Sequence, residues 1–295
     1  MSKILVTGAS GNLGQAIIHH LLETYKVPAS NIVAASRDAS KLSSLGSKGV
    51  ELRNADFDDS ASLDAAFTGI DTVLIISTDA LAVPGQRLTQ HEAAVAAATK
   101  AGVKHIAYTS MPNPDKSLVT FAPDHLGTEQ AIKASGLPYT IIRNAWYNDN
   151  YLHGMPHNLQ GGQWFTAMGD GKVSNVSRDD CARAAAAVLA KGQPENKTYT
   201  ITGPQSLNAD EIATIISQTT GKPLAVVKVS PADLQKGIEG AGLPGFVAEM
   251  LASADANIAA GNFDVVTSDY ETLTGEKSQT TEAFFKAHKA ALLSA

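Results

Sequence analysis

Short apolar runs alternate with longer stretches of helical periodicity throughout the first half of the chain. The apolar runs have the length of β-strands and lie at residues 3–8, 31–36, 50–56, 72–77, 105–110 and 139–145. Several are almost continuously apolar, as expected for strands that helices cover on both faces of a parallel sheet. The stretches of helical periodicity lie at residues 13–25, 60–69, 88–102 and 126–136. The stretches 88–102 and 126–136 end on Gly102 and Gly136, which is typical of a helix C-terminus.

This alternation predicts an α/β fold with a Rossmann-type, doubly wound parallel sheet, in which ligands bind beyond the carboxyl ends of the strands. After about residue 150 the pattern loosens, and helices are expected from about residue 179 and after a capping Ser206 or Asn208. We expect a sheet domain over residues 1–150, to which some later segments return. Residues 151–295 are expected to form mainly a smaller, mostly α-helical lobe for the substrate.

A glycine-rich loop joins the first predicted strand to the first predicted helix, in the sequence VTGASGNLGQ. Its first glycine permits a tight turn, the second lets the backbone approach a pyrophosphate, and the third lets the helix pack closely on the strand. The helix N-terminus then presents free N–H groups to the phosphates. The alternative is a glycine turn with no ligand. The predicted contacts are Gly8, Ser10, Gly11, Asn12, Leu13 and Gly14.

The residues after the second strand indicate which dinucleotide is bound. An acidic residue at this place would hold the adenosine ribose of NAD, but the strand ends in Ala35-Ser36-Arg37-Asp38. The planar guanidinium of Arg37 and the ammonium of Lys41 are groups that suit the binding of a 2′-phosphate. The sequence therefore favours NADP(H), with NAD(H) as the second choice, and residues 1–150 become the NADP-binding domain. In the alternative interpretation, Asp38 pairs with Lys41 on a solvated surface.

Polar residues also follow three further predicted strands at the same edge of the sheet. Asp56 is placed to accept from the adenine amino group and Phe57 to lie against the base, although a surface carboxylate is the alternative for Asp56. Small hydroxyl residues end the fourth and fifth strands, where the ribose and nicotinamide of a bound dinucleotide would run. These residues are Ser77, Thr78, Thr109 and Ser110.

Charge and composition narrow the class of partner. The 295 residues carry 23 Lys and Arg against 29 Asp and Glu, a net charge of −6, which argues against nucleic acid and anionic membranes as partners. The single Cys181 excludes an internal disulfide and is expected to be a buried small side chain in a reducing compartment. His153 and His157 lack further ligands, so no metal site is expected. With no signal peptide pattern and no membrane-length apolar run, we expect a cytoplasmic monomer or homodimer with a small-molecule substrate.

Several segments together resemble the NmrA-like atypical short-chain dehydrogenases. They include TGASGNLG, SRDASK, NADFDD, AGVKHIAYTS, HLGTEQAIKASGLPYTIIRNAWYNDNY, GDGKVSNVSRDDCARAAAAVL and NKTYTITG, and the resemblance runs from residue 3 to about residue 285. Within that family the chain looks most like the bacterial NADPH:quinone oxidoreductase 2 group and triphenylmethane reductase. The resemblance implies NADPH-dependent reduction of a quinone or similar flat acceptor, without flavin or metal. The superfamily also contains NADP(H)-sensing regulators without turnover, which is the alternative function.

The sequence lacks the Tyr-x-x-x-Lys pair that such chains usually carry, and HLGTE stands at about its place. The lysine of that pair lowers the pKa of the tyrosine, which then exchanges a proton with an alcohol or carbonyl. His125 and Glu129 would not do this in the same way, so ketone chemistry and a sugar-nucleotide epimerase are disfavoured. A quinone needs mainly to be placed against the nicotinamide. Glu129 is expected to be a first-turn acidic residue paired with Lys133.

The segment RNAWYNDNY, which ends the sixth predicted strand, supplies further candidates for the substrate site. The resemblance places Asn144 near the nicotinamide. Trp146, Tyr147 and Tyr151 offer flat aromatic walls for a flat acceptor, or alternatively anchor the C-terminal lobe as core residues. The predicted catalytic residues are Asn144, His125 and Tyr147.

Overall fold

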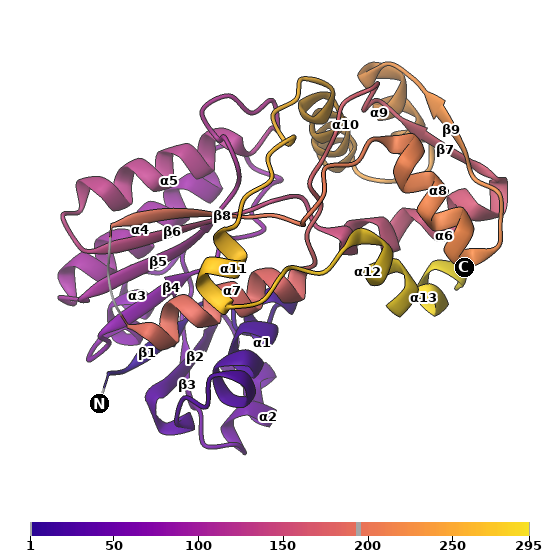
Figure 1. The fold of residues 1–295 in the computed structure, drawn as a ribbon. Coiled ribbons are helices and arrows are strands. Elements are labelled where there is room, and N and C mark those ends of the chain that lie inside the picture. Colours follow the sequence, from indigo (N-terminus) through magenta and orange to yellow (C-terminus); the bar gives the residue numbers. More distant parts are fainter. Residues whose placement is uncertain (1, 193–195, 295) are drawn as a thin grey trace. The chain divides into compact units, whose positions relative to one another are not determined.

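The computed structural model describes residues 2–192 and 196–294, and its larger sheet has seven strands (Figure 1). The strand order is β3-β2-β1-β4-β5-β6-β8. The strands are β1 (Ile4–Val6), β2 (Ile32–Ser36), β3 (Glu51–Asn54), β4 (Thr72–Ile75), β5 (His105–Ser110), β6 (Tyr139–Asn144) and β8 (Lys197–Ile201). The first six lie within the apolar runs of the sequence, which confirms the predicted Rossmann-type fold.

The central strand β1 pairs in parallel with β2 on one side and with β4 on the other. Ile4 lies opposite Ile32 in β2 and opposite Thr72 in β4. Every residue of β1, β2 and β4 is buried, because helices cover both faces of the sheet. The strand order reverses direction between β1 and β4, so the loops after these strands lie at the switch point where doubly wound sheets bind ligands.

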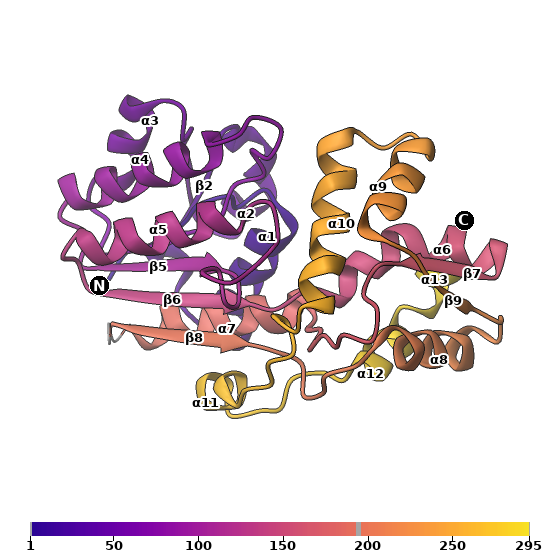
Figure 2. The same ribbon diagram turned by 90° about the horizontal axis from the view of Figure 1, so that it is seen from above.

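The helices associated with the sheet lie on its two faces. They are α1 (Asn12–His19), α2 (Ser43–Gly46), α3 (Ser60–Phe67), α4 (Gln86–Lys100), α5 (Ala122–Ala134) and α7 (Arg178–Lys191). Figure 2 shows α3, α4 and α5 along one face and α7 along the other. Leu63, Ala94 and Ile132, from α3, α4 and α5, share one apolar cluster with residues of the strands. None of the described helices combines the length and apolarity needed to cross a membrane.

Two local features of this part differ from the sequence expectation. The helix α5 begins four residues before the expected start at residue 126, so Glu129 lies in the middle of the helix and not in its first turn. A π-helical turn, η1 (His20–Thr24), continues α1, and the 3-10 turns η2 (Ala29–Asn31) and η3 (Ala39–Leu42) precede and follow β2. Turns of three to five residues are too short to give a periodic signal.

The chain folds into two compact units. One contains Met1–Met111, Asp124–Arg143 and Cys181–Tyr199, and the other contains Pro112–Pro123, Asn144–Asp180 and Thr200–Ala295. Each unit is thus assembled from three separate segments of the chain. Cys181, the single cysteine of the sequence, is fully buried in α7.

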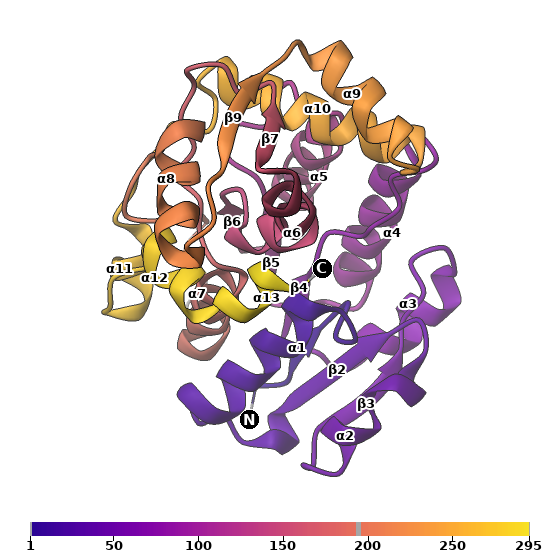
Figure 3. The same cartoon turned by 90° about the vertical axis from the view of Figure 1, so that its right-hand side faces the viewer.

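The second unit is mainly helical and also holds a two-stranded parallel ribbon of β7 (Gln163–Thr166) and β9 (Ala225–Lys228). Figure 3 shows the ribbon beside α8 and α6. Asn208 caps α8 by accepting from the backbone N–H of Glu211, whose side chain accepts from the Asn208 backbone in return. This capping box identifies Asn208, not Ser206, as the cap. The remaining elements are η4 (Asn148–Asn150), α6 (Tyr151–Gly161), α8 (Ala209–Thr220), α9 (Pro231–Gly240), α10 (Gly245–Ala259), α11 (Asp269–Thr274), α12 (Thr281–Ala287) and α13 (Lys289–Leu293).

A carboxylate on α10 fastens this helix to the end of β7. Asp255 Oδ2 accepts hydrogen bonds from Thr166 Oγ1 at 2.7 Å and from the Ala167 backbone N–H at 2.8 Å. Burial raises the pKa of Asp255, although the two hydrogen bonds act in the opposite direction. Because the unfolded chain ionises this carboxyl first, the native state loses stability as the pH rises from the ordinary carboxyl pKa towards the raised value.

We predict that Asp255→Asn stabilises the protein at pH 7, because the amide oxygen retains both hydrogen bonds and the buried charge is removed. The gain should be on the order of 1 kcal/mol per unit of raised pKa, and it should vanish near pH 4. Urea denaturation at both pH values measures it. Asp255→Leu, which loses both acceptors, should destabilise the protein at either pH. A gain from Asp255→Asn that is larger at pH 4 than at pH 7 would contradict this account.

Candidate dinucleotide site

The glycine loop has the backbone geometry that a pyrophosphate requires. Gly8, two residues after β1, adopts a φ of 59°, and the Gly11 N–H donates to the Gly8 carbonyl at 3.0 Å to close the turn. A Cβ on Gly14 would lie 2.4 Å from the Gly8 carbonyl oxygen, so only glycine allows α1 to approach the loop this closely. Asn12 begins α1 with no side chain capping the helix, which leaves its first N–H groups available to phosphate oxygens. The loop therefore fits a dinucleotide.

A hydrogen bond between two serines connects this loop to the end of β2. Ser10 Oγ lies 2.9 Å from Ser36 Oγ, and Gln15 Nε2 donates to the Ser10 carbonyl at 2.8 Å. Gly11 and Asn12 are exposed, and Leu13 is half-buried. Ser36 stands where NAD-binding folds have an acidic residue, so the end of β2 carries no negative charge.

The two basic residues predicted to hold a 2′-phosphate, Arg37 and Lys41, are both exposed. Arg37 Nη2 lies 3.8 Å from Asp79 Oδ1 in the loop after β4. The Asp38 carboxylate accepts from the backbone N–H of Ser40 at 3.0 Å and from its hydroxyl at 2.6 Å, and these bonds lower its pKa. Asp38 thus caps the turn η3, which differs from the alternative that pairs it with Lys41.

The residues after β3 are more involved in the fold than the sequence indicated. Asp56 Oδ1 accepts from the Asp58 backbone N–H at 3.1 Å, which stabilises the turn into α3. Phe57 is 9% exposed and belongs to the apolar cluster beneath α3 and α4. Little of the Phe57 ring is left to contact an adenine base.

The hydroxyl residues after β4 and at the end of β5 bond to one another and to the helices. The Ser77 N–H donates to Thr109 Oγ1 at 2.9 Å, and the Thr78 N–H donates to His91 Nε2 at 2.9 Å. Ser110 is buried and donates to Glu129 Oε1 at 2.7 Å. These bonds fix the backbone at the carboxyl ends of β4 and β5. Ser77 and Thr78 remain half-buried at this edge.

Glu129 forms a buried ion pair with Arg143 of β6. The carboxylate is 1% exposed and forms a bidentate pair. It accepts hydrogen bonds from Arg143 Nε at 2.8 Å and from Arg143 Nη2 at 2.7 Å. The expected partner Lys133 is the weaker one, with its ammonium 3.8 Å from Glu129 Oε2. Glu129 therefore connects α5 to β5 and β6, and a lysine at this position would face the Arg143 guanidinium.

His125 is also held in the interior, with both ring nitrogens engaged. Its Nε2 lies 3.1 Å from Arg87 Nη2 and its Nδ1 lies 2.8 Å from Tyr108 Oη. A guanidinium can only donate, so Nε2 is the acceptor and Nδ1 carries the proton. Burial, with Arg87 nearby, keeps the pKa of His125 well below its ordinary value. The ring is therefore neutral at physiological pH.

His91, which is not among the predicted site residues, extends the same buried network. It accepts from the Thr78 N–H at Nε2, so its Nδ1 carries the proton and donates to Thr128 Oγ1 at 2.9 Å. Thr128 in turn donates to the Asp124 carbonyl at 2.6 Å. Burial, followed by the influence of Arg87, lowers the pKa of His91 to about 3. A histidine among other polar residues of a helix gives no distinct signal in the sequence, because its burial becomes visible only in the fold.

The predicted residues from Asn144, the last residue of β6, onwards belong to the second unit, where they form a polar cluster. Asn144 Nδ2 donates to Tyr147 Oη at 3.1 Å, and Asn144 Oδ1 is buried with no hydrogen-bond partner among the described residues. The Arg178 guanidinium lies over the Tyr147 ring, 5.3 Å from its centre, and donates to Asp149 at 3.0 Å. Asn144 and Tyr147 are therefore brought together, while His125 belongs to the first unit.

The neighbouring aromatic residues have packing roles. The Trp146 ring lies 5.8 Å from Phe263, and the Tyr151 ring contacts Trp164 and Phe285 at 5.7 and 5.8 Å. Tyr151 Oη donates to Asn175 Oδ1 at 3.3 Å. These contacts agree with the alternative in which Trp146 and Tyr151 anchor the helical lobe.

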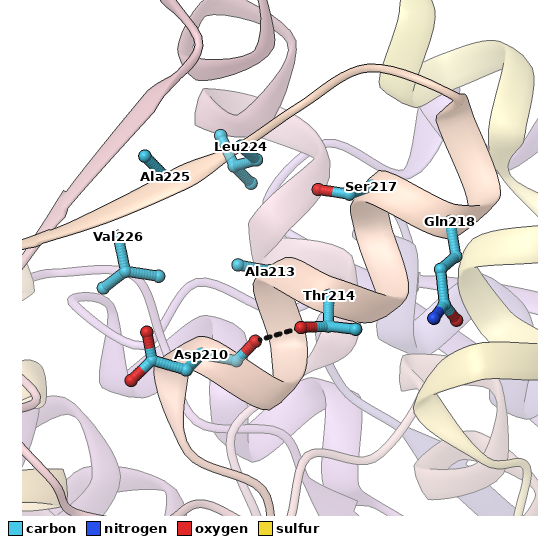
Figure 4. Close-up of a pocket in the computed structure, with 8 residues that line it drawn as sticks. All are labelled: Asp210, Ala213, Thr214, Ser217, Gln218, Leu224, Ala225 and Val226. Carbon is cyan, nitrogen blue, oxygen red and sulfur yellow. Dashed lines mark hydrogen bonds between the residues drawn. The ribbon is translucent and has the colours of Figure 1, made fainter.

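A separate groove of about 360 Å³ lies between α8 and β9 (Figure 4). Its walls are Asp210, Thr214, Ser217 and Gln218 on the helix and Leu224, Ala225 and Val226 on the strand side, and none of them is a predicted site residue. His153 and His157 are exposed on α6. Within residues 2–192 and 196–294, no group of three or more His, Cys, Asp and Glu side chains could hold a metal ion.

The sheet topology and the glycine loop define a Rossmann-type dinucleotide-binding protein. Within this class, the chain belongs to the NmrA-like family, whose model matches residues 1–285. The resemblance noted in the sequence is thereby confirmed.

Individual relatives match the chain over nearly its whole length. Quinone oxidoreductase 2 of Escherichia coli (strain K12) is 38% identical over 258 residues, which cover 88% of this chain and 88% of that protein. The crystal structure of an NADPH-dependent quinone oxidoreductase from E. coli, complexed with NADPH, matches with a TM-score of 0.91 at 36% identity and covers 97% of this chain and 99% of that one. Triphenylmethane reductase of Citrobacter sp., complexed with NADP(H), gives a TM-score of 0.91 at 37% identity and covers 97% and 100%.

We predict that Glu129→Gln destabilises the protein by about 3 kcal/mol, because it leaves the partly buried Arg143 guanidinium without its counter-charge. Lys133→Ala is the matched control: it removes the exposed partner of the same carboxylate and should cost no more than about 0.5 kcal/mol. Urea unfolding followed by far-UV circular dichroism measures both. Equal losses in the two variants would show that the Arg143 pair is not the dominant one.

We also predict that His91 and His125 stay neutral between pH 5 and pH 8, both with the proton on Nδ1. Their burial beside Arg87 disfavours the charged rings, and the Thr78 N–H and Arg87 fix Nε2 as the acceptor in each. Long-range ¹H–¹⁵N spectra of the imidazoles report charge and tautomer directly. A resonance from either ring that titrates near pH 6.5 would contradict the network described above.

Proposed function

We propose that this chain is an NADPH-dependent oxidoreductase that transfers hydride directly to a quinone or a similar flat acceptor. The glycine loop carries the cofactor part of the proposal, since it leaves the α1 N-terminus uncapped and Gly14 allows the helix to approach the loop closely. Support for the reaction comes from the family relatives, which are named as a quinone oxidoreductase and a triphenylmethane reductase and were crystallised with NADPH or NADP(H).

The preference for NADPH rests on the end of β2. Ser36 is neutral and hydrogen-bonds to Ser10, while Arg37 is exposed directly after it. A 2′-phosphate would gain a charged hydrogen-bonding partner in Arg37, with Lys41 as a second cation. A ribose diol without phosphate would find no carboxylate at the strand end. We propose NADPH as the working cofactor, with NADH as a weaker substitute.

A bound NADPH supplies the hydride, and a quinone takes it up together with a proton from water to become a hydroquinone. The chain's contribution is to bind and orient, because no Tyr–Lys pair is present to donate a proton. Asn144 and Tyr147, joined by a hydrogen bond, are proposed to contact the reacting groups through the unpartnered Asn144 Oδ1. His125, whose nitrogens both bond internally, is proposed to act as a positioning residue and not as an acid.

We propose a small-molecule acceptor as the partner, consistent with the acidic net charge of −6, and a cytoplasmic monomer or homodimer. The absence of flavin and of metal from the reaction is likewise a proposal.

The function is tested by following the absorbance of NADPH and NADH at a fixed concentration of purified protein with benzoquinones, naphthoquinones, cationic dyes and ketones. We expect rapid NADPH oxidation with quinones or dyes and none above background with ketones. If no acceptor is reduced while NADPH still binds, the chain is a non-catalytic NADP(H) sensor, and the search moves to protein partners. Rapid ketone reduction would contradict the proposed lack of proton donation.

The cofactor preference has its own test. Arg37→Glu should weaken NADPH binding by about two orders of magnitude while changing NADH binding only slightly, because only NADPH carries the 2′-phosphate. Lys104→Glu is the control, since Lys104 directly precedes β5 and lies at the opposite edge of the sheet from the glycine loop. Titration of nicotinamide fluorescence measures both constants. Unchanged NADPH affinity in Arg37→Glu would remove Arg37 from the site.

A further inference from the structure

We propose that Asp79, in the loop after β4, competes with the 2′-phosphate of NADPH for Arg37 and so limits the preference of this protein for NADPH over NADH. The inference rests on the proposed NADPH function and adds to it a residue that sets cofactor specificity. Its basis is the ion pair between Arg37 Nη2 and Asp79 Oδ1 at 3.8 Å, which connects the loops after two strands that both flank β1.

The backbone around Asp79 is fixed from the interior. The Ser77 N–H donates to Thr109 Oγ1, and the Thr78 N–H donates to His91 Nε2, both at 2.9 Å. His91 is fully buried and is itself held by Thr128. Asp79 comes directly after these two anchored residues. The backbone that leads into Asp79 is therefore held by hydrogen bonds that do not involve the ion pair with Arg37.

The backbone around Arg37 is fixed in a similar way. Ser36 ends β2 in register with Asn54 of β3, and the Ala39 N–H donates to Asn54 Oδ1 at 3.0 Å on the far side of Arg37. The Asp38 carboxylate caps the turn that follows through Ser40. Arg37 thus stands between two restrained segments and moves mainly through its side-chain torsions.

Both charged groups remain in contact with water, with side chains 71% exposed for Arg37 and 89% for Asp79. A pair this exposed is weak and exchanges readily, so a phosphate dianion is able to take Arg37 from the carboxylate. The carboxylate then remains close to the phosphate and repels it through a partly screened solvent. NADH has no 2′-phosphate and meets no such repulsion. Asp79 should therefore weaken NADPH binding selectively.

The first experiment measures dissociation constants for NADPH and NADH, without any acceptor, by isothermal titration of the wild type and of Asp79→Asn. We expect Asp79→Asn to bind NADPH about three- to tenfold more tightly at low salt, with NADH changed by less than about twofold. The gain should shrink in 0.5 M salt, where exposed charges are screened. Asp64→Asn is the matched control, since it removes one charge from another exposed ion pair, with Lys100, and should leave both constants unchanged.

A double substitution isolates the role of Arg37. In an Arg37→Gln background, Asp79→Asn should give a clearly smaller gain in NADPH affinity, because the competition for the guanidinium has been removed. If NADPH binding by the wild type depends on Arg37 but Asp79→Asn has no effect, this inference is overturned. The proposed function then remains intact. Wild-type protein that binds neither dinucleotide, or binds NADPH without dependence on Arg37, would contradict the cofactor assignment itself. An equal gain for NADPH and NADH in Asp79→Asn would also overturn the inference.

Discussion

The strand β1 pairs in parallel with β2 on one side and with β4 on the other, and this pairing places the loops after all three strands at one edge of the sheet. The loop after β1 carries Gly8, the loop after β2 carries Arg37, and the loop after β4 carries Asp79. The register sets how near these residues lie to one another. If β2 or β4 did not pair with β1, the glycine turn would have no charged neighbour. The candidate site therefore depends first on this strand pairing and only then on individual side chains.

A second level of order comes from buried polar side chains. A buried hydrogen-bond network in the first unit consists of His91, Tyr108, His125 and Thr128. Arg143 also pairs with Glu129 in this unit. Buried polar groups are stable only when they are satisfied, so this network accepts few substitutions and defines the positions of α4 and α5 against the sheet. The segment HLGTE thus has a structural purpose. His125 and Glu129 are both engaged in buried hydrogen bonds that hold the fold.

Much of the fold could be predicted from the sequence, because periodicity and length report local structure. Six apolar runs became strands, and the loop from Gly8 to Gly14 was recognisable from its place between strand and helix. The ribbon of β7 and β9 was not predicted, because its short, partly exposed strands lie outside the strand–helix alternation of the first half of the chain. The ion pair between Glu129 and Arg143 was not predicted either. A helical i,i+4 partner is visible in sequence, whereas a partner on a neighbouring strand becomes known only when the sheet is assembled. Single hydroxyl residues such as Ser110 gave an equally ambiguous signal.

Hydride is proposed to pass directly from the nicotinamide to the acceptor, by positioning and without a protein acid. This proposal is tested most directly with NADPH deuterated at C4 and a cationic triarylmethane dye, whose reduced carbon keeps the transferred atom. Mass spectrometry of the product formed in ordinary water should show one deuterium on that carbon when the label occupies the transferred face of the nicotinamide. Product without deuterium from either labelled face would contradict direct transfer.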